Sequence, residues 1–282
     1  MNQDRRNFIG GSDIAAVMGV SRWKTPLQLW SEKTGKVEPE DLSDKEYVEL
    51  GSELEDFIAK KFEKKTGLKV RRAPKQYVDI MFPFMACQVD RLVTGTDDLL
   101  ECKNASAWKE KEWAGEEIPI EYIFQVSWQL MITGRKKGYI AVLIGGNKFI
   151  WKEIDADQEL FLKMTNSAIK FWDMVQNNIP PMAQSGDNDF LIELYPSGSD
   201  QIKEATQDIA EAIATLQLIK AEIIEAEKKK DEIEAKIKAV IGNAGGIKTP
   251  EFTAKWLNVK GGTYTVTKKD SRQLRITKNK GV

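Results

Sequence analysis

The chain has 282 residues, with 42 Lys and Arg against 43 Asp and Glu, and 41% of its residues are apolar. This length has room for one large domain with an appendage or for two modest domains. The net charge of −1 means that any affinity for nucleic acid must come from local patches. Histidine is absent, which excludes Ser-His-Asp, Cys-His and His-ligated zinc chemistry. We expect no membrane span and no signal segment, because no apolar run is long enough.

The first part of the chain predicts helices followed by strands. Residues 5–19 form a basic arm, a Gly-Gly turn and a helix that Ser12 or Asp13 is expected to cap. A second helix starts at Pro26, and a longer amphipathic helix ends at Gly67. In chain order the expected elements are helices within 5–19, 26–35 and 45–67 and strands at 68–78, 82–93 and 99–103.

The middle of the chain predicts one more helix inserted between strands. Gly134 ends an apolar helical pattern over 120–133. Two apolar strands, 138–144 and 148–154, flank Gly145-Gly146-Asn147, which is a strong hairpin signal. A last helix covers 158–177. The order indicates an α/β domain over 1–185, with a mixed (α+β) sheet flanked by helices.

A long helix is expected after a linker at 186–199 that is rich in Gly, Ser, Asp and Pro. Over 200–242 apolar residues recur at steps of three and four, which is typical of a coiled coil. Packing of this helix against its own domain is the alternative. The predicted seam consists of Ile202, Ala205, Ile209, Ala212, Leu216, Ile219, Ile223, Ala226, Lys230, Ile233, Ile237 and Val240.

The tail, 243–282, has short alternating stretches and predicts a small basic β element. A solvated basic tail and a nucleic-acid contact both fit this composition. The basic residues of this tail are Lys268, Lys269, Arg272, Arg275, Lys278 and Lys280.

Asp90 and the Glu101-Cys102-Lys103 segment carry the chemistry that the sequence suggests. Alternation along a strand places Glu101 and Lys103 on one face, and Asp90 reaches that face from the neighbouring antiparallel strand. Two carboxylates and an amine suit Mg²⁺ with a water beside it, because a lysine can orient or deprotonate that water. An ordinary Glu/Lys face of a surface hairpin is the alternative.

Five segments in order resemble a known family: RRNFIGGSDIAAVMG, GSELEDFIAKKFEKKTG, QVDRLV, LLECKNAS and FQVSWQLMITG. They are similar to the YqaJ-type viral recombinase nucleases, the phage lambda exonuclease family within the PD-(D/E)xK superfamily. The resemblance covers about residues 5–180. It implies the PD-(D/E)xK nuclease core, and the long C-terminal helix also occurs in longer family members.

The resemblance implies a set of active-site residues. Asp90 and Glu101 match the metal-binding acids, and Lys103 matches the lysine that acts on the nucleophilic water. Glu55, four residues after Gly51, matches the acid carried by a helix. The resemblance also assigns the backbone carbonyl of Cys102 to the metal and Gln125 to the lining of the site.

The resemblance also implies a pocket for the 5′-phosphate of a DNA end. Arg5 and Ser12, seven residues apart, match the pair that holds this phosphate. Arg6 is adjacent to Arg5, so the choice between the two arginines stays open. Gln88 stands where the family has a serine, two residues before the metal-binding aspartate.

The implied function is a Mg²⁺-dependent exonuclease, with Mn²⁺ as a substitute, that degrades double-stranded DNA from its ends. Family resemblance implies 5′→3′ digestion, a homo-oligomeric ring and a single-strand annealing recombinase as a partner. It further implies a phage or prophage product in a bacterial cytoplasm. The alternatives are an endonuclease that cuts internally and a non-catalytic DNA-binding or assembly module on the same fold.

Overall fold

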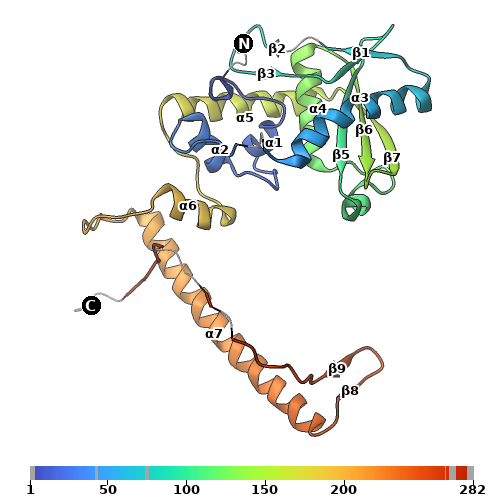
Figure 1. Cartoon of the computed structure of the whole chain (residues 1–282). Helices are drawn as coiled ribbons and strands as arrows, with labels where there is room; N and C mark the ends of the chain where they lie inside the picture. Colours follow the sequence, from blue (N-terminus) through green and yellow to red (C-terminus); the bar gives the residue numbers. More distant parts are fainter. Residues whose placement is uncertain (1–3, 42–43, 74–75, 264, 267–270, 278–282) are drawn as a thin grey trace. The chain divides into compact units, whose positions relative to one another are not determined.

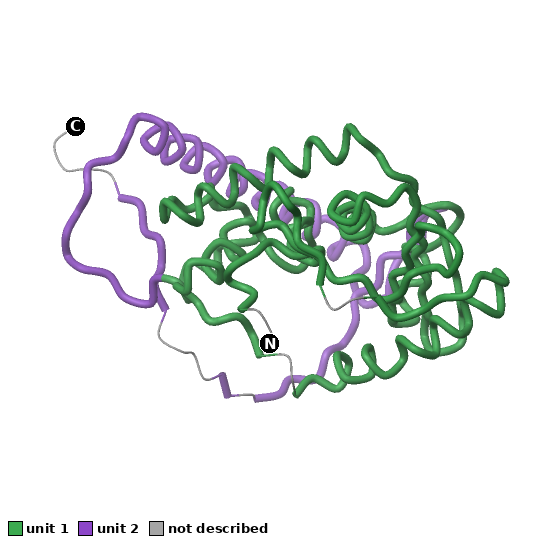
Figure 2. The backbone as a smooth tube through the Cα atoms, turned by 90° about the horizontal axis from the view of Figure 1, so that it is seen from above, with its two compact units in different colours: residues 1–194 green, residues 195–282 purple. Residues whose placement is uncertain are grey.

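The computed structural model describes residues 4–41, 44–73, 76–263, 265–266 and 271–277 (Figure 1). The chain forms two compact units, Met1–Leu194 and Tyr195–Val282, which we call unit 1 and unit 2 (Figure 2). Each unit is described by itself.

Unit 1 is built on a five-stranded mixed sheet. The strand order is β1 (Val70–Arg72), β4 (Arg91–Val93), β5 (Leu99–Ala105), β6 (Lys137–Ile144) and β7 (Lys148–Asp155). Strands β5 and β6 are parallel, and each other neighbouring pair is antiparallel. Helices flank this sheet, so the expected mixed α/β fold class is confirmed.

Helices cover both faces of the central strands. Helix α4 (Ile120–Thr133) connects β5 to β6, as a parallel pair requires. Its Val126 and Leu130 belong to the same core cluster as Leu99 of β5. On the opposite face, α3 (Glu46–Thr66) buries Ile58 and Phe62 against Leu100 and Leu143. Strand β6 is buried almost throughout, which explains its continuous apolar sequence.

Three further helices extend the layer on the α4 side. They are α1 (Ile14–Val17), α2 (Pro26–Lys33) and α5 (Gln158–Gln176), and residues of all three join the α4 cluster. Two short 3₁₀ helices precede α1 and α4 in the chain; they are η1 (Arg5–Asn7) and η2 (Ala107–Trp113), respectively. The N-terminal arm therefore belongs to the packed domain.

Two of the predicted strands are wrong in extent, because each is interrupted. The segment 68–78 contains β1 and the separate β2 (Tyr77–Val78), and 82–93 contains β3 (Ala86–Cys87) and β4. Strands β2 and β3 pair with each other in a separate two-stranded sheet. The break before β4 leaves Asp90 outside the strand, where its side chain is free to accept a backbone hydrogen bond.

The expected cap of the first helix is confirmed in position, but it lacks a capping bond. Asp13 occupies the N-cap position of α1, but its side chain makes no capping bond to the helix. The Asp13 carboxylate instead accepts a hydrogen bond from the backbone N–H of Gly10 at 3.0 Å. A buried ion pair holds it in that position, as described below.

Part of the segment predicted as a linker, 186–199, is helical. Unit 1 ends with η3 (Ser185–Asp187) and α6 (Asn188–Leu194). Asp187 is fully buried, and it accepts hydrogen bonds from the hydroxyl of Thr25 and the backbone N–H of Gln184. These bonds tie the end of unit 1 to the start of α2.

Unit 2 consists of one long helix and a hairpin in its described part. Helix α7 spans Gln207–Ile241 and starts later than residue 200 because 201–206 is irregular. Strands β8 (Gly246–Lys248) and β9 (Thr253–Lys255) pair as a hairpin, and beyond Lys255 the described residues contain no strand. Lys268, Lys269, Lys278 and Lys280 lie outside the described residues.

The apolar seam of α7 is exposed in this chain. Ile209, Ile219, Ile223 and Ile233 are between 45% and 57% exposed. The described residues therefore leave this helix without a covered apolar face. No helix among the described residues is both long enough and apolar enough to cross a membrane.

Gly138 allows α4 to approach β6, and we expect Gly138→Ala to destabilise the protein. An added Cβ lies 2.6 Å from Val126 and 3.1 Å from Leu99. Overpacking of this kind costs about 1–3 kcal/mol, and urea unfolding measures it. The matched control is Gly51→Ala within α3, where a Cβ meets nothing within 4 Å. This control is expected to stabilise the helix by about 1 kcal/mol; equal effects of both substitutions would contradict the packing argument.

Candidate active site

The face of β5 that points toward α4 carries an acid and an amine. Glu101 pairs with Ile140 and Lys103 pairs with Val142 along the β5–β6 ladder, so both lie on the same face. The same face holds Leu99, whose side chain packs in the α4 cluster. The alternation expected for this strand is therefore present.

Glu101 is a buried carboxylate with three side-chain donors. It is 3% exposed, and Lys103 Nζ lies 2.7 Å from its Oε1. Gln125 donates to Oε1 at 2.5 Å and Gln129 donates to Oε2 at 2.7 Å, both from α4. A carboxylate offers about four lone-pair sites, so these donors leave room for a further ligand.

Asp90 shares this site from the residue before β4. Its Oδ2 accepts a hydrogen bond from the backbone N–H of Cys102 at 2.7 Å. Burial, and after it the charge of Glu101, raise the pKa of Asp90 to about 8. Two acids that repel each other in a buried site create a demand for positive charge.

Lys103 supplies one positive charge to the pair. Burial alone would lower its pKa, but the carboxylates of Glu101 and Asp90 outweigh burial and raise it. Its ammonium also lies 5.4 Å from the centre of the Tyr122 ring, within cation–π range. Lys103 is therefore held protonated between the acids and an aromatic face.

Glu55 lies close to this site but has a different partner. Its carboxylate forms an ion pair with Arg91, which is 5% exposed and also pairs with Asp56. Arg91 donates in addition to the backbone carbonyl of Asp90 at 2.6 Å. The helix-borne acid is thus linked to Asp90 through an arginine.

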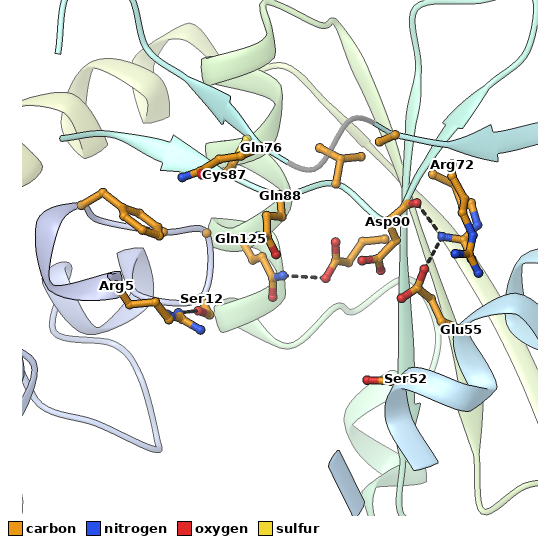
Figure 3. Close-up of a pocket in the computed structure, with 17 residues that line it drawn as sticks. Arg5, Ser12, Ser52, Glu55, Arg72, Gln76, Cys87, Gln88, Asp90 and Gln125 are labelled. Atoms are coloured by element: carbon orange, nitrogen blue, oxygen red, sulfur yellow. Dashed lines mark hydrogen bonds and ion pairs between the residues drawn. The ribbon is translucent and has the colours of Figure 1, made fainter. Parts of the chain in front are cut away.

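Most of the predicted site residues line one cavity of about 840 Å³, but Arg6, Cys102 and Lys103 are not among its lining residues. Figure 3 shows Arg5 and Ser12 on one side of it and Asp90 and Glu55 on the other, with Gln125 between them. Arg5 Nη2 donates to Ser12 Oγ at 2.7 Å. Arg6 instead pairs with Glu38, so its guanidinium is engaged elsewhere. The geometry favours Arg5 as the partner of Ser12.

Gln88 also lines the cavity, and it is exposed. Its backbone carbonyl accepts a hydrogen bond from Gln129 at 2.8 Å. The side chain of Gln129 therefore connects the segment before β4 to Glu101. In the close-up view, Gln88 lies between Ser12 and Asp90 (Figure 3).

The chemistry of the donor set fits a hard divalent cation. Asp90 and Glu101 are carboxylates in one cavity, and burial, followed by the charge of Glu101, raises the pKa of Asp90 there. Mg²⁺ is commonly held by one or two protein carboxylates and keeps several waters. Within the described residues no group of three or more His, Cys, Asp or Glu is arranged to hold a metal. The ion pair with Arg91 engages the Glu55 carboxylate, so Glu55 does not form such a group with Asp90 and Glu101 in this structure.

Two residues of this site were not predicted from the sequence. Gln129 lies one helical turn after Gln125, and both contact Glu101, but this spacing is equally typical of a packing face. Arg91 follows Asp90 directly, and its burial is not visible in the local sequence. The signal for Gln129 was the polar pair on an otherwise apolar helix.

Comparisons with known proteins place the chain in a family. Residues 2–136 match the YqaJ-like viral recombinase domain. The chain is similar to the uncharacterised protein YqaJ of Bacillus subtilis (strain 168), with 41% identity over 241 residues. This match covers 83% of the present chain and 75% of that protein.

Solved structures show the same fold at low identity. An alkaline exonuclease (LHK-Exo) from Laribacter hongkongensis matches with a TM-score of 0.53 and 19% identity, covering 62% of this chain and 91% of that one. The structure of LHK-Exo in complex with dAMP matches with a TM-score of 0.52 and 19% identity, covering 67% and 93% of the two chains. At this identity the likeness concerns the fold. The extent of the match to YqaJ shows that the chain belongs to the YqaJ-like viral recombinase family.

Proposed function

We propose that this protein is a Mg²⁺-dependent deoxyribonuclease that degrades double-stranded DNA from its ends in the 5′→3′ direction. Mn²⁺ is the expected substitute, and the product is a 3′ single strand for recombination. Membership of a viral recombinase family supports a role in DNA processing. The chain shares its fold with an alkaline exonuclease, and this shared fold supports a nuclease activity for the chain.

The single observation that carries the proposal is the arrangement of Asp90, Glu101 and Lys103. The two carboxylates line one cavity, and the protonated amine of Lys103 lies 2.7 Å from Oε1 of Glu101. Phosphodiester hydrolysis needs a polarised phosphoryl group, an activated water and a stabilised leaving oxygen. A bound Mg²⁺ supplies Lewis-acid polarisation of the phosphoryl group.

The protein side chains then have distinct tasks. Asp90 and Glu101, with the carbonyl of Cys102 as a further oxygen, would hold the cation. Glu55 would supply a third carboxylate from the adjoining edge of the cavity. Gln125 and Gln129 hold the Glu101 carboxylate in place through their hydrogen bonds. Lys103 orients the attacking water and offsets negative charge as the phosphorane forms.

The preference for DNA ends rests on Arg5 and Ser12. An exposed arginine that donates to a serine hydroxyl presents donors suited to a terminal phosphate. Both residues line the cavity that contains Asp90, so one strand can contact both sites. Gln88 lines the same cavity and is a further donor for that phosphate. Internal cleavage is the competing function, since the same donors also suit backbone phosphates.

Unit 2 supports a proposal about assembly. We infer that α7 pairs with another copy of the chain, because its apolar seam is exposed over most of its length. A ring of subunits and a single-strand annealing recombinase as partner fit a family that acts in recombination. By the same reasoning we place the enzyme with its DNA substrate in a bacterial cytoplasm, as a phage or prophage product.

The wild-type protein is expected to degrade linear duplex DNA with Mg²⁺ and to leave closed circular DNA intact. Asp90→Asn and Glu101→Gln are each expected to lower the rate by at least about 10²-fold, because each removes a charge that holds the cation. Gel assays measure the rates, and isothermal titration measures Mg²⁺ binding. The control is Asp97→Asn, whose side chain is 97% exposed on the turn before β5.

Three results would speak against this function. Nicking of closed circles indicates an endonuclease, and binding without cleavage indicates a DNA-binding module. Near-normal activity of Asp90→Asn would show that the site is assigned wrongly.

Arg5→Ala is expected to reduce the preference for 5′-phosphorylated over 5′-hydroxyl ends by roughly 10- to 100-fold. The loss corresponds to one charge-assisted contact with the phosphate, about 1.5–3 kcal/mol. Ser12→Ala should act in the same direction. The matched control is Arg6→Ala, because Arg6 pairs with Glu38. Steady-state kinetics on two otherwise identical duplexes measure the ratio, and an equal loss on both duplexes contradicts a phosphate pocket.

Ile223→Lys is expected to lower the mass of the assembled protein, because Ile223 lies on the predicted seam of α7. The control is Ile224→Lys, which changes an adjacent exposed isoleucine off the seam and is expected to leave the mass unchanged. Light scattering of the full-length variants measures both masses. If the two variants keep the wild-type mass, α7 does not drive self-association.

A further inference from the structure

A buried ion pair lies directly beneath the Arg5–Ser12 pair. Asp13 is 7% exposed and Lys33 is 8% exposed, and Lys33 Nζ lies 2.8 Å from Asp13 Oδ2. Lys33 also donates to the backbone carbonyl of Arg5 at 2.6 Å. On its other oxygen, Asp13 lies 3.4 Å from Arg5 Nη2. Three charged side chains therefore share one cluster, and only Arg5 is largely exposed.

The Asp13 carboxylate creates an electrostatic problem for a phosphate site. It neutralises Arg5 in part, and it repels any anion that approaches Arg5. Burial strengthens both effects, because less water screens the charges. A phosphate pocket that consisted of Arg5, Ser12 and Asp13 alone would carry no net positive charge.

Lys33 removes this problem without contact with the pocket opening. Its ammonium balances Asp13, so the cluster of Arg5, Asp13 and Lys33 keeps a net charge of +1. Of the neighbouring charges, Lys24 pairs with Glu32 and Arg6 pairs with Glu38, so these two pairs add little net charge to the cluster.

Burial, the largest single influence, raises the pKa of Asp13. The charges of Lys33 and Arg5, together with hydrogen bonds to the carboxylate, outweigh burial, so the pKa of Asp13 is lowered overall. Asp13 therefore stays ionised and needs a counter-charge at working pH. Its hydrogen bond from the Gly10 N–H fixes the turn that carries Ser12. The cluster thus orders the arm and sets its charge at the same time.

We propose that Lys33 is a charge-balancing residue that cancels Asp13 and so leaves the charge of Arg5 available to the 5′-phosphate of a DNA end. The inference rests on the proposed end-directed function and deepens it. Asp13 orders the Arg5–Ser12 pair at an electrostatic cost, and Lys33 offsets that cost from beneath. Lys33 is a positioning and charge-setting residue, since it reaches the phosphate only through its neighbours.

The test compares two duplexes that differ only in a 5′-phosphate or a 5′-hydroxyl, using the full-length protein with Mg²⁺. The readout is the ratio of kcat/KM on the two ends. Lys33→Met is expected to reduce this ratio by about tenfold, equivalent to 1.4 kcal/mol. The double variant Asp13→Asn with Lys33→Met restores the net charge and is expected to restore most of the ratio. Asp13→Asn alone is expected to keep the wild-type ratio or exceed it.

The matched control is Lys36→Met, on the turn that follows α2. It removes one positive charge near Lys33, but the Lys36 ammonium lies over the Trp30 ring at 5.2 Å and has no contact with Asp13. Its ratio is expected to stay at the wild-type value. Thermal unfolding of each variant shows which proteins are folded.

The outcomes separate this inference from the function on which it rests. A wild-type protein with no preference for phosphorylated ends contradicts the proposed end recognition. A normal wild-type preference that persists in folded Lys33→Met overturns the role of Lys33. A double variant no better than Lys33→Met shows that Lys33 acts only through structure, and this also overturns the inference. If Lys33→Met does not fold, the other two variants provide the test. Loss of the preference for phosphorylated ends in folded Asp13→Asn or in the folded double variant would then overturn the inference.

Discussion

Burial of the Glu101 carboxylate is the constraint on which the structure of unit 1 depends. Glu101 lies on β5, between β4 and β6, and is 3% exposed. A charge in such a position costs several kcal/mol unless it is paired and hydrogen-bonded. Its donors come from Lys103 on the same strand and from Gln125 and Gln129 on α4. Helix α4 must therefore present its polar edge to β5, although the rest of that face is apolar.

The same rule explains two other groups of buried charges that join distant segments. Lys33 and Asp13 connect α2 to the N-terminal arm. Arg91 connects β4 to Glu55 and Asp56 on α3. Removing one partner of such a pair is expected to be more harmful than removing both, because an unpaired charge remains buried. Each pair fixes the position of an element that lines the cavity.

The sequence predicts most of the helices and the core of the site, and the reasons are local. Apolar periodicity and Gly134 predict α4 with the observed bounds, and Gly145-Gly146 predicts the β6–β7 hairpin. Alternation in β5 predicts that Glu101 and Lys103 share a face. These features depend on residues close together in the chain.

The features that were missed depend on contacts across the chain. The breaks in the strands follow from bonds between side chains and backbone, such as those that Asp79 accepts from the N–H groups of Met81 and Phe82. Asp13 and Lys33 are 20 residues apart, so neither one reveals the other's burial. Asp13 looks like a helix cap in the sequence because its residue type and position both suit one. Its buried lysine partner, and not the helix, determines where its carboxylate points.

Charge balance gives both ends of the cavity the same electrostatic character. Without a cation, Asp90, Glu101 and Lys103 sum to −1 when all are ionised, which repels a phosphodiester. Burial and then the charge of Glu101 raise the pKa of Asp90 to about 8, so this site takes up a proton more readily than a solvated aspartate does. With a divalent cation bound by Asp90 and Glu101, as proposed, the sum would be +1. At the other end, Arg5, Asp13 and Lys33 also sum to +1. Under this proposal each end would carry one net positive charge for one phosphate, and each would use a carboxylate to order the groups that hold it.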